Sequence, residues 1–315
     1  MKNQTKFLIY FLISTICSGS LLAQKQIITI NKKVNDDKSI DFYYEKNSPG
    51  SYSVDLQFSN VQNCDVREHK AVLRSHSGFL MKLRPIDKNK GIGYSYNIYS
   101  IMGELNPRID SLFGYSLPFK NGKKVKIKEA GNAGEKFLGQ EKPANWKSFF
   151  VISPTPDTIC SMRKGIVVRI VNEHENTDSA DAIYTSKRNS VTIEHEDGTC
   201  ATYTGFNQNK IWVKLGESVH PQTEIGVSEM YNGKGYTIHF NVHYLFDKDF
   251  KSTSKNLKGY KSKFKNINPI FITQEGDVQI ESGKEYTAKV DEMVITKEFS
   301  KSEKKKYAKE HLNFK

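Results

Sequence analysis

Residues 189–203, with the sequence NSVTIEHEDGTCATY, decide the fold that we expect for this chain. Apolar and polar residues alternate before and after Asp197-Gly198, a dipeptide preferred at the centre of a tight hairpin turn. The run GIVVRIV at 165–171 has the composition of a buried strand. No amphipathic helix of normal length precedes the C-terminal tail. The centre of the chain is therefore predicted to be an antiparallel β-sheet.

The region from Ile27 to about Asp110 shows the same type of pattern in shorter runs. Alternating segments at 39–44, 52–58 and 79–83 are separated by Asn, Ser, Pro and Gly. Short strands at this spacing are typical of a small β-sandwich. This region shows no recognisable set of catalytic residues, so we interpret it as a packing or docking module.

Composition shifts divide the rest of the chain. The turn-rich sequence YSLPFKNG at 115–122 marks the entry into a second domain. Residues 247–266 are rich in Lys, Ser and Asn, which is typical of a solvated loop, and 297–315 form a basic tail, either a surface helix or frayed. The expected organisation is a signal peptide at 1–23, a β-sandwich-like module at 24–120, a β core at 121–246, a Lys-rich loop and β-rich extension at 247–296, and the tail.

The first residues have the pattern of a secretory signal peptide. Lys2 and Lys6 precede an apolar run at 7–13, and Leu-Leu-Ala at 21–23 forms a cleavage site. The alternative is an uncleaved anchor, but the apolar run is short for a membrane span. We expect a bacterial protein exported to the periplasm, the cell surface or the medium, with no transmembrane helix after cleavage.

The net charge restricts the partners. It is +12 for the whole chain and 12 − 2 = +10 once Lys2 and Lys6 are removed. A basic surface favours polyanions such as nucleic acid, anionic lipid or cell-wall polymers. Export argues against nucleic acid and leaves the cell envelope as the source of partners. Nothing in the sequence indicates an oligomeric state.

Three cysteines, Cys64, Cys160 and Cys200, remain after cleavage of the signal peptide. An oxidising compartment would allow one disulfide and one thiol. Cys160 and Cys200 fall in strands that we expect to be neighbours, which favours that pair. Three buried free thiols are the alternative.

Four segments, in this order and spacing, resemble the M23 (lysostaphin/LytM-type, Gly-Gly) zinc endopeptidases. The likeness covers roughly 149–246 and implies an antiparallel β core. The segments are PTPDTICSMRKGIVV at 154–168, VTIEHEDG at 191–198, YTGF at 203–206 followed by VKLGESV at 213–219, and GYTIHFNV at 235–242.

The resemblance also implies a zinc site held by an early His, an Asp and the second His of a His-x-His pair, with two further histidines acting on water and the oxyanion. Three ligands and an open position allow zinc to activate water. In this chain Phe150 stands at the Asp position, Gly205 and Thr237 replace the two further histidines, and His239 alone remains as a vestigial ligand. No His lies between His76 and His174, and Leu138 or Trp146 falls near the place of the early ligand.

The replacement of these zinc-binding and catalytic residues predicts that the chain does not hydrolyse peptides by the family mechanism. The region that corresponds to the family's substrate groove is expected to bind a ligand without cleaving it. Its candidate residues are Trp146, Phe150, Tyr203, Thr237 and His239, and the expected ligand is peptidoglycan or an envelope protein. No cofactor is expected; if one is bound, zinc is the expected one.

Two alternatives stay open. One is a zinc metalloendopeptidase with displaced ligands, for which His239, His243 and His195 are candidates. The other is an envelope assembly or scaffold protein acting through the N-terminal module.

Overall fold

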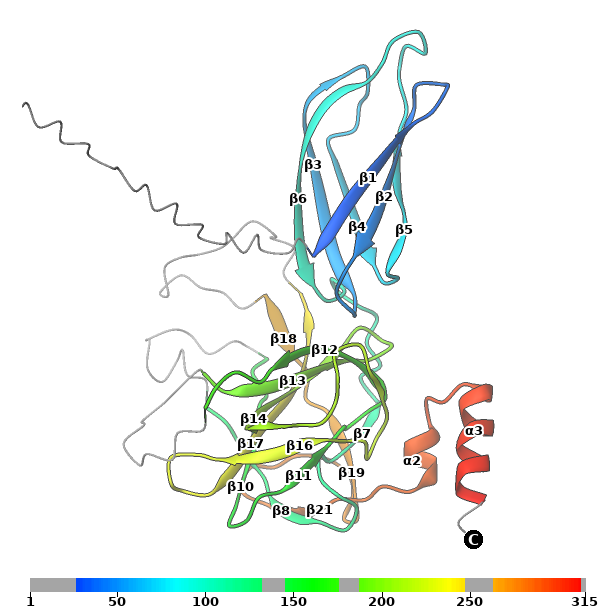
Figure 1. The fold of residues 1–315 in the computed structure, drawn as a ribbon. Coiled ribbons are helices and arrows are strands. Elements are labelled where there is room, and N and C mark those ends of the chain that lie inside the picture. Colours follow the sequence, from blue (N-terminus) through cyan, green and yellow to red (C-terminus); the bar gives the residue numbers. More distant parts are fainter. Residues whose placement is uncertain (1–26, 132–144, 176–186, 247–262, 313–315) are drawn as a thin grey trace, which may run out of the picture.

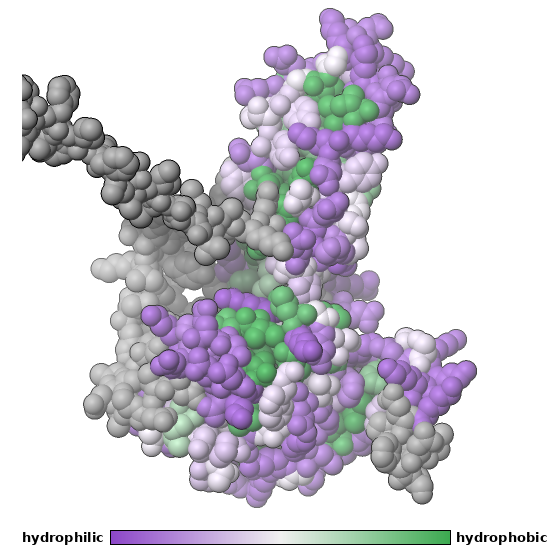
Figure 2. Space-filling model, in the orientation of Figure 1, coloured by the Kyte–Doolittle hydropathy of each residue, from purple (hydrophilic) through white to green (hydrophobic). Residues whose placement is uncertain are grey.

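The computed structural model describes residues 27–131, 145–175, 187–246 and 263–312. The signal peptide, Leu138 and most of the Lys-rich loop lie outside these ranges. The described chain forms an upper β lobe and a lower β lobe, with two short helices beside the lower one (Figure 1). In the same orientation, the visible face of both lobes is mostly hydrophilic, with an apolar patch on the lower lobe (Figure 2). The prediction of a mostly β protein with antiparallel sheets is confirmed. Within the described ranges, no helix is long and apolar enough to cross a membrane.

The upper lobe is a sandwich of two three-stranded sheets, as the alternating runs predict. One sheet has the order β1 (Ile28–Val34), β2 (Ile40–Lys46), β5 (Ser77–Leu83), and the other β4 (Glu68–Leu73), β3 (Tyr52–Gln62), β6 (Gly93–Met102). Inward-facing residues of both sheets form one core, in which the Phe42 ring packs against Phe58, Tyr94 and Tyr96 at centroid distances of 5.7–5.9 Å. Aromatic packing of this kind stabilises a small sandwich beyond the area that it buries.

The lower lobe is built on a ten-stranded sheet, and the hairpin predicted around Asp197-Gly198 is its centre. The main path of the sheet runs β15-β12-β13-β14-β16-β17-β10-β9, while β11 pairs with β16 and β18 with β17. The strands are β9 (Lys128–Glu129), β10 (Phe149–Ser153), β11 (Thr158–Cys160), β12 (Gly165–Val171), β13 (Asn189–Glu194), β14 (Cys200–Ile211), β15 (Ser218–Val219), β16 (Glu224–Met230), β17 (Tyr236–Leu245) and β18 (Phe264–Asn266).

The β-rich segment after residue 266 returns to the start of the lower lobe. β19 (Ile270–Thr273) pairs with β20 (Gly276–Gln279) and, in parallel, with β7 (Gly114–Ser116). β21 (Glu285–Thr287) pairs with β8 (Lys124–Lys126). Two helices follow, α2 (Glu292–Thr296) and α3 (Lys301–Leu312), so the described part of the tail is a surface helix. The extension thus closes the lower core, in which Phe271 is fully buried.

The two lobes contact each other through backbone groups and glycines. The Ser51 amide donates to Glu194 Oε2 at 2.6 Å, and the Asn106 amide donates to the Leu245 carbonyl at 2.9 Å. Gly50, at φ +78°, lies so close to Val168 that a side chain there would overlap it. The positive φ and the close contact with a side chain of the other lobe both favour glycine at this position.

The cysteines correct one prediction. Cys64, Cys160 and Cys200 are all buried free thiols. The proposed Cys160–Cys200 bond fails because β11 pairs with β16, where Cys160 lies opposite Glu224, and not with β14. Cys200 lies opposite Glu194 and His243 instead. The two strands are not neighbours, although their sequence patterns allowed it.

Candidate functional site

Strand β17 gathers the positions that the sequence singled out. Phe150 of β10 lies directly opposite His239, and Thr204 of β14 lies opposite the same His239 from the other side. Thr237, two residues earlier on β17, projects to the same face because side chains alternate along a strand. The opposite face of β17 is buried in the core through Ile238, Phe240 and Val242.

A buried arginine occupies the space beside Gly205. This glycine has φ +115°, and any side chain there would overlap the Arg188 guanidinium and come within 2.5 Å of the Thr237 carbonyl oxygen. Arg188 forms an ion pair through its Nε with Glu229 on β16, and its Nη2 donates to the Thr237 carbonyl at 3.2 Å. The Arg188 guanidinium therefore fills the position from which the side chain at 205 is missing.

The ion pair is nearly dry. The Arg188 and Glu229 side chains are each 7% exposed, and the guanidinium carbon lies 4.3 Å from the centroid of the Tyr231 ring. Burial raises the pKa of Glu229, while Arg188 acts in the opposite direction. A buried carboxylate without a cation would be far costlier, so the two residues depend on each other.

The imidazole of His239 is held neutral. Burial, assisted by the charge of Arg188, lowers its pKa to about 3. The Phe150 ring stacks on it with a centroid distance of 5.3 Å and an interplanar angle of 19°. Both side chains are half-buried, so together they form an aromatic surface at the edge of the filled cleft.

The remaining candidates lie in two other places. Tyr203 is fully buried in the hydrophobic core, where its hydroxyl accepts a hydrogen bond from the Met162 amide at 2.8 Å. Trp146 is half-buried, and its indole N–H donates to the Ala130 carbonyl beyond edge strand β9. The structure thus gathers Phe150, Thr237 and His239 around Gly205, and it places Tyr203 in the core and Trp146 at the sheet edge.

Zinc does not fit the residues of this cleft. His239 is partly buried and lies in the field of the Arg188 guanidinium, whose positive charge disfavours a second cation nearby. Among the described residues, no group of three or more His, Cys, Asp or Glu is placed to hold a metal ion. His195 and His243 lie within each other's electrostatic reach, but two imidazoles fall short of the three protein ligands of a catalytic zinc site.

Sequence reasoning missed Arg188, Glu229 and Tyr231. A signal for Glu229 was present, because a carboxylate on a strand with buried neighbours needs a cationic partner. Arg188 directly precedes β13, far from Glu229 in sequence, and the pattern offered no way to pair them.

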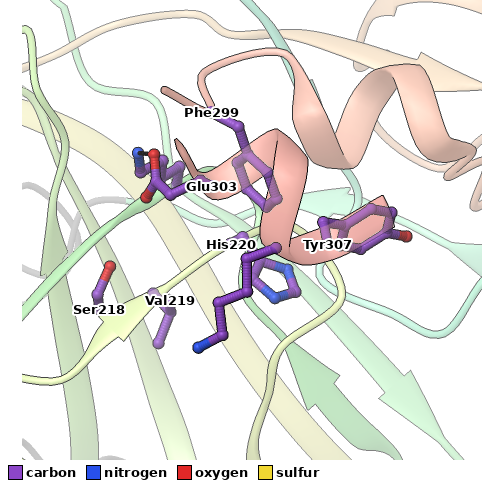
Figure 3. Close-up of a pocket in the computed structure, with 8 residues that line it drawn as sticks. Ser218, Val219, His220, Phe299, Glu303 and Tyr307 are labelled. Carbon is purple, nitrogen blue, oxygen red and sulfur yellow. Dashed lines mark hydrogen bonds and ion pairs between the residues drawn. The ribbon is translucent and has the colours of Figure 1, made fainter. Parts of the chain in front are cut away.

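A hollow lies where α3 and the segment before it meet the lower lobe. It has a volume of about 170 Å³, and Figure 3 shows His220, Phe299, Glu303 and Tyr307 around it. Lys164 binds Glu303 at 2.7 Å, and the His220 and Phe299 rings are 5.6 Å apart. These contacts attach α3 to the lobe.

Arg163 anchors the segment between the two helices. It is 3% exposed, pairs with Asp197 and Glu298 at 2.8 Å each, and stacks over Phe113. The segment leading into α3 is therefore fixed to the lobe by a buried cation as well as by aromatic packing.

Comparison with known proteins gives structural likeness only. No family model matches the chain, and no curated protein matches it. Similar solved structures include the M23 metalloprotease pseudoalterin from the deep sea, at 14% identity over 56% of this chain and 95% of that one, with a TM-score of 0.30. A zinc-containing peptidase from Vibrio cholerae has 15% identity over 68% of this chain and 77% of its own, also with a TM-score of 0.30.

The SpoIIQ–SpoIIIAH pore-forming complex is a further match. Its matched chain shares 19% identity over 42% of this chain and 84% of its own, with a TM-score of 0.27. At these identities and TM-scores the likeness says nothing about activity or partners, so the functional conclusion rests on the residues of this chain.

Proposed function

We propose that this protein is an exported, non-catalytic M23-like protein that binds peptidoglycan or a protein of the cell envelope. The observation that carries the proposal is the Arg188–Glu229 pair, which fills the space beside Gly205. Hydrolysis by the family mechanism needs a cation-binding cleft with an open position for water. Here the Arg188 guanidinium, paired with Glu229, lies beside Gly205, where the resemblance implies a histidine that acts on water and the oxyanion.

Binding is supported by the aromatic side chains around the Arg188–Glu229 pair. Phe150, His239 and Tyr231 are half-buried, and the imidazole is neutral at physiological pH because its pKa is lowered to about 3. A rigid aromatic surface of this kind gives contact area at a small entropic cost. The basic net charge, +10 after removal of the two lysines of the signal peptide (12 − 2), adds attraction to acidic envelope polymers.

The proposal is tested by sedimentation with purified peptidoglycan sacculi, using the chain from residue 24 onward. We expect the protein to pellet with the sacculi without releasing soluble fragments. Phe150→Ala should weaken retention, whereas Phe79→Ala, which truncates a 56% exposed aromatic residue on the upper lobe, should leave it unchanged.

The outcomes separate the rival hypotheses. Release of fragments by the purified protein would overturn the non-catalytic part of the proposal. Loss of retention in Phe79→Ala but not in Phe150→Ala would move the binding function to the upper lobe. Failure of the wild type to sediment would remove peptidoglycan and leave an envelope protein as the ligand.

A further inference from the structure

A groove of about 460 Å³ lies between the two lobes, and none of its lining residues belongs to the site around Arg188 and Gly205. The turn before β3 lines it with Gly50 and Ser51, and β12 lines it with Gly165 and Ile166. The end of β13 and its hairpin turn also contribute lining residues. The charged and titratable residues around it are Arg74, Glu104, Lys164, Glu194, His195, Glu196 and Glu298.

The cations of the groove already have partners. Arg74 binds Glu104 at 2.6 Å, and Lys164 binds Glu303 at 2.7 Å. Glu298 is held by Arg163 beneath it. The groups left over are Glu194, His195 and Glu196, which are consecutive in the chain.

Glu194 is a buried carboxylate with one oxygen unused. The residue is 8% exposed, and its Oε2 accepts the Ser51 amide across the lobe junction at 2.6 Å. Its Oε1 has no hydrogen-bond partner. The nearest cation that influences it, Lys46, instead donates to the carbonyls of Ser48 and Gly50. A buried acceptor left unpaired is costly, and such exceptions call for a ligand or a function.

His195 offers a second unused acceptor. The Thr199 hydroxyl donates to Asp197 at 2.7 Å, so the His195 Nδ1 that lies 2.8 Å from it must carry the proton and donate. The Nε2 of His195 is then a bare lone pair, and it has no partner. The Nε2 atom does not readily take up a proton, because burial and the charge of Arg163 lower the pKa of His195 to about 3.

We propose that this groove binds the primary ammonium group of an aliphatic chain. The Glu194 carboxylate, with the exposed carboxylate of Glu196 at the mouth, accepts its N–H groups. The exposed apolar side chain of Ile166 and the glycines that line the groove accommodate the methylene chain. An ammonium group supplies donors only, which matches a site where the unused groups are acceptors only. The inference does not depend on the function proposed for the Arg188 cleft.

Two sources carry this chemistry, a lysine-type side chain of a peptide and a free diamine. The probes are Nα-acetyl-lysine amide for the first and cadaverine for the second. Nα-acetyl-norleucine amide is the control, because it has the same methylene chain without the ammonium group. Binding is measured by titration calorimetry on the chain from residue 24 onward.

We expect an ammonium probe to bind and the norleucine control not to bind. Binding of acetyl-lysine amide assigns the peptide source, and binding of cadaverine alone assigns the free diamine. Glu194→Gln keeps an oxygen for the Ser51 amide, and Glu196→Gln changes an exposed residue. Each should weaken binding about tenfold, the value of one hydrogen bond to a charged group.

Glu173→Gln is the matched control, because the Glu173 side chain is 80% exposed and lies outside the groove. It should bind the probe as the wild type does. The proposal is overturned if neither ammonium probe binds, if the norleucine control binds equally well, or if both groove variants retain full affinity. None of these results bears on hydrolysis or on sedimentation with sacculi.

Discussion

Replacing Arg188 by Met tests whether the buried ion pair holds the cleft together. The substitution keeps the volume of an unbranched side chain but leaves Glu229 as an unpaired carboxylate that is 7% exposed. Breaking a buried pair on one side typically costs about 3–5 kcal/mol. The hydrogen bond to the Thr237 carbonyl is also lost, at about 1 kcal/mol. Protonation of Glu229 would reduce the cost of leaving its charge unpaired. We therefore expect Arg188→Met to lower the free energy of unfolding by about 3 kcal/mol at pH 8.

The double variant Arg188→Met/Glu229→Leu removes both charges. Hydrophobic replacement of a whole buried pair is often neutral or stabilising, so its free energy of unfolding should lie within about 1 kcal/mol of the wild type. Arg74→Met is the control, because Arg74 belongs to an ion pair in which its own side chain is 64% exposed. Such pairs contribute about 0–1 kcal/mol. The assay is urea unfolding followed by circular dichroism.

The pH dependence adds a second readout. The folded-state pKa of Glu229 is raised, so its ionised form destabilises the fold at a pH above that pKa. In Arg188→Met the opposing charge is gone and the pKa rises further. The deficit of this variant relative to the wild type should therefore shrink as the pH falls from 8 towards 5.5. The reasoning is refuted if Arg188→Met costs no more than Arg74→Met, or if the double variant is as unstable as the single one.

Two further predictions concern Gly205 and the thiols. Gly205→Ala should cost about 2–4 kcal/mol, from a positive φ and a clash with the Thr237 carbonyl, whereas Gly122→Ala, at φ +80° with open space around it, should cost about 1 kcal/mol. Equal losses in thermal unfolding would show that the space beside Gly205 is not filled. In the chain from residue 24 onward, three thiols should react with Ellman's reagent, and only after unfolding. The reason is that Cys64, Cys160 and Cys200 are buried, and burial raises the pKa of Cys160 to about 12. Recovery of one thiol without reductant would instead demonstrate a disulfide.

The sequence predicted the architecture better than the site. Period-two alternation and the Asp197-Gly198 turn identified the sandwich and the central hairpin, because both signals are local. The resemblance to the M23 family singled out Phe150, Gly205, Thr237 and His239, and the structure places these four residues near one another, while their roles stay a prediction. Nothing local indicated that Arg188 would fill the space beside Gly205.

The sequence also did not indicate which strands pair with each other. Pairing of Cys160 and Cys200 failed because the partner of a short strand depends on the whole sheet, not on its own pattern. The groove at Glu194 was likewise invisible, because it arises where the upper lobe meets the end of β13. Contacts that join distant segments are the ones that a single sequence specifies least.

The most direct test of the central claim measures zinc and cleavage on the same preparation. The chain from residue 24 onward is purified without chelator, incubated with zinc, and desalted. Its metal content is then determined by mass spectrometry, and soluble muropeptides released from sacculi are quantified. With Arg188 and Glu229 filling the cleft, we predict substoichiometric zinc and no release above a buffer control. One zinc per chain together with turnover that His239→Ala abolishes would contradict the account.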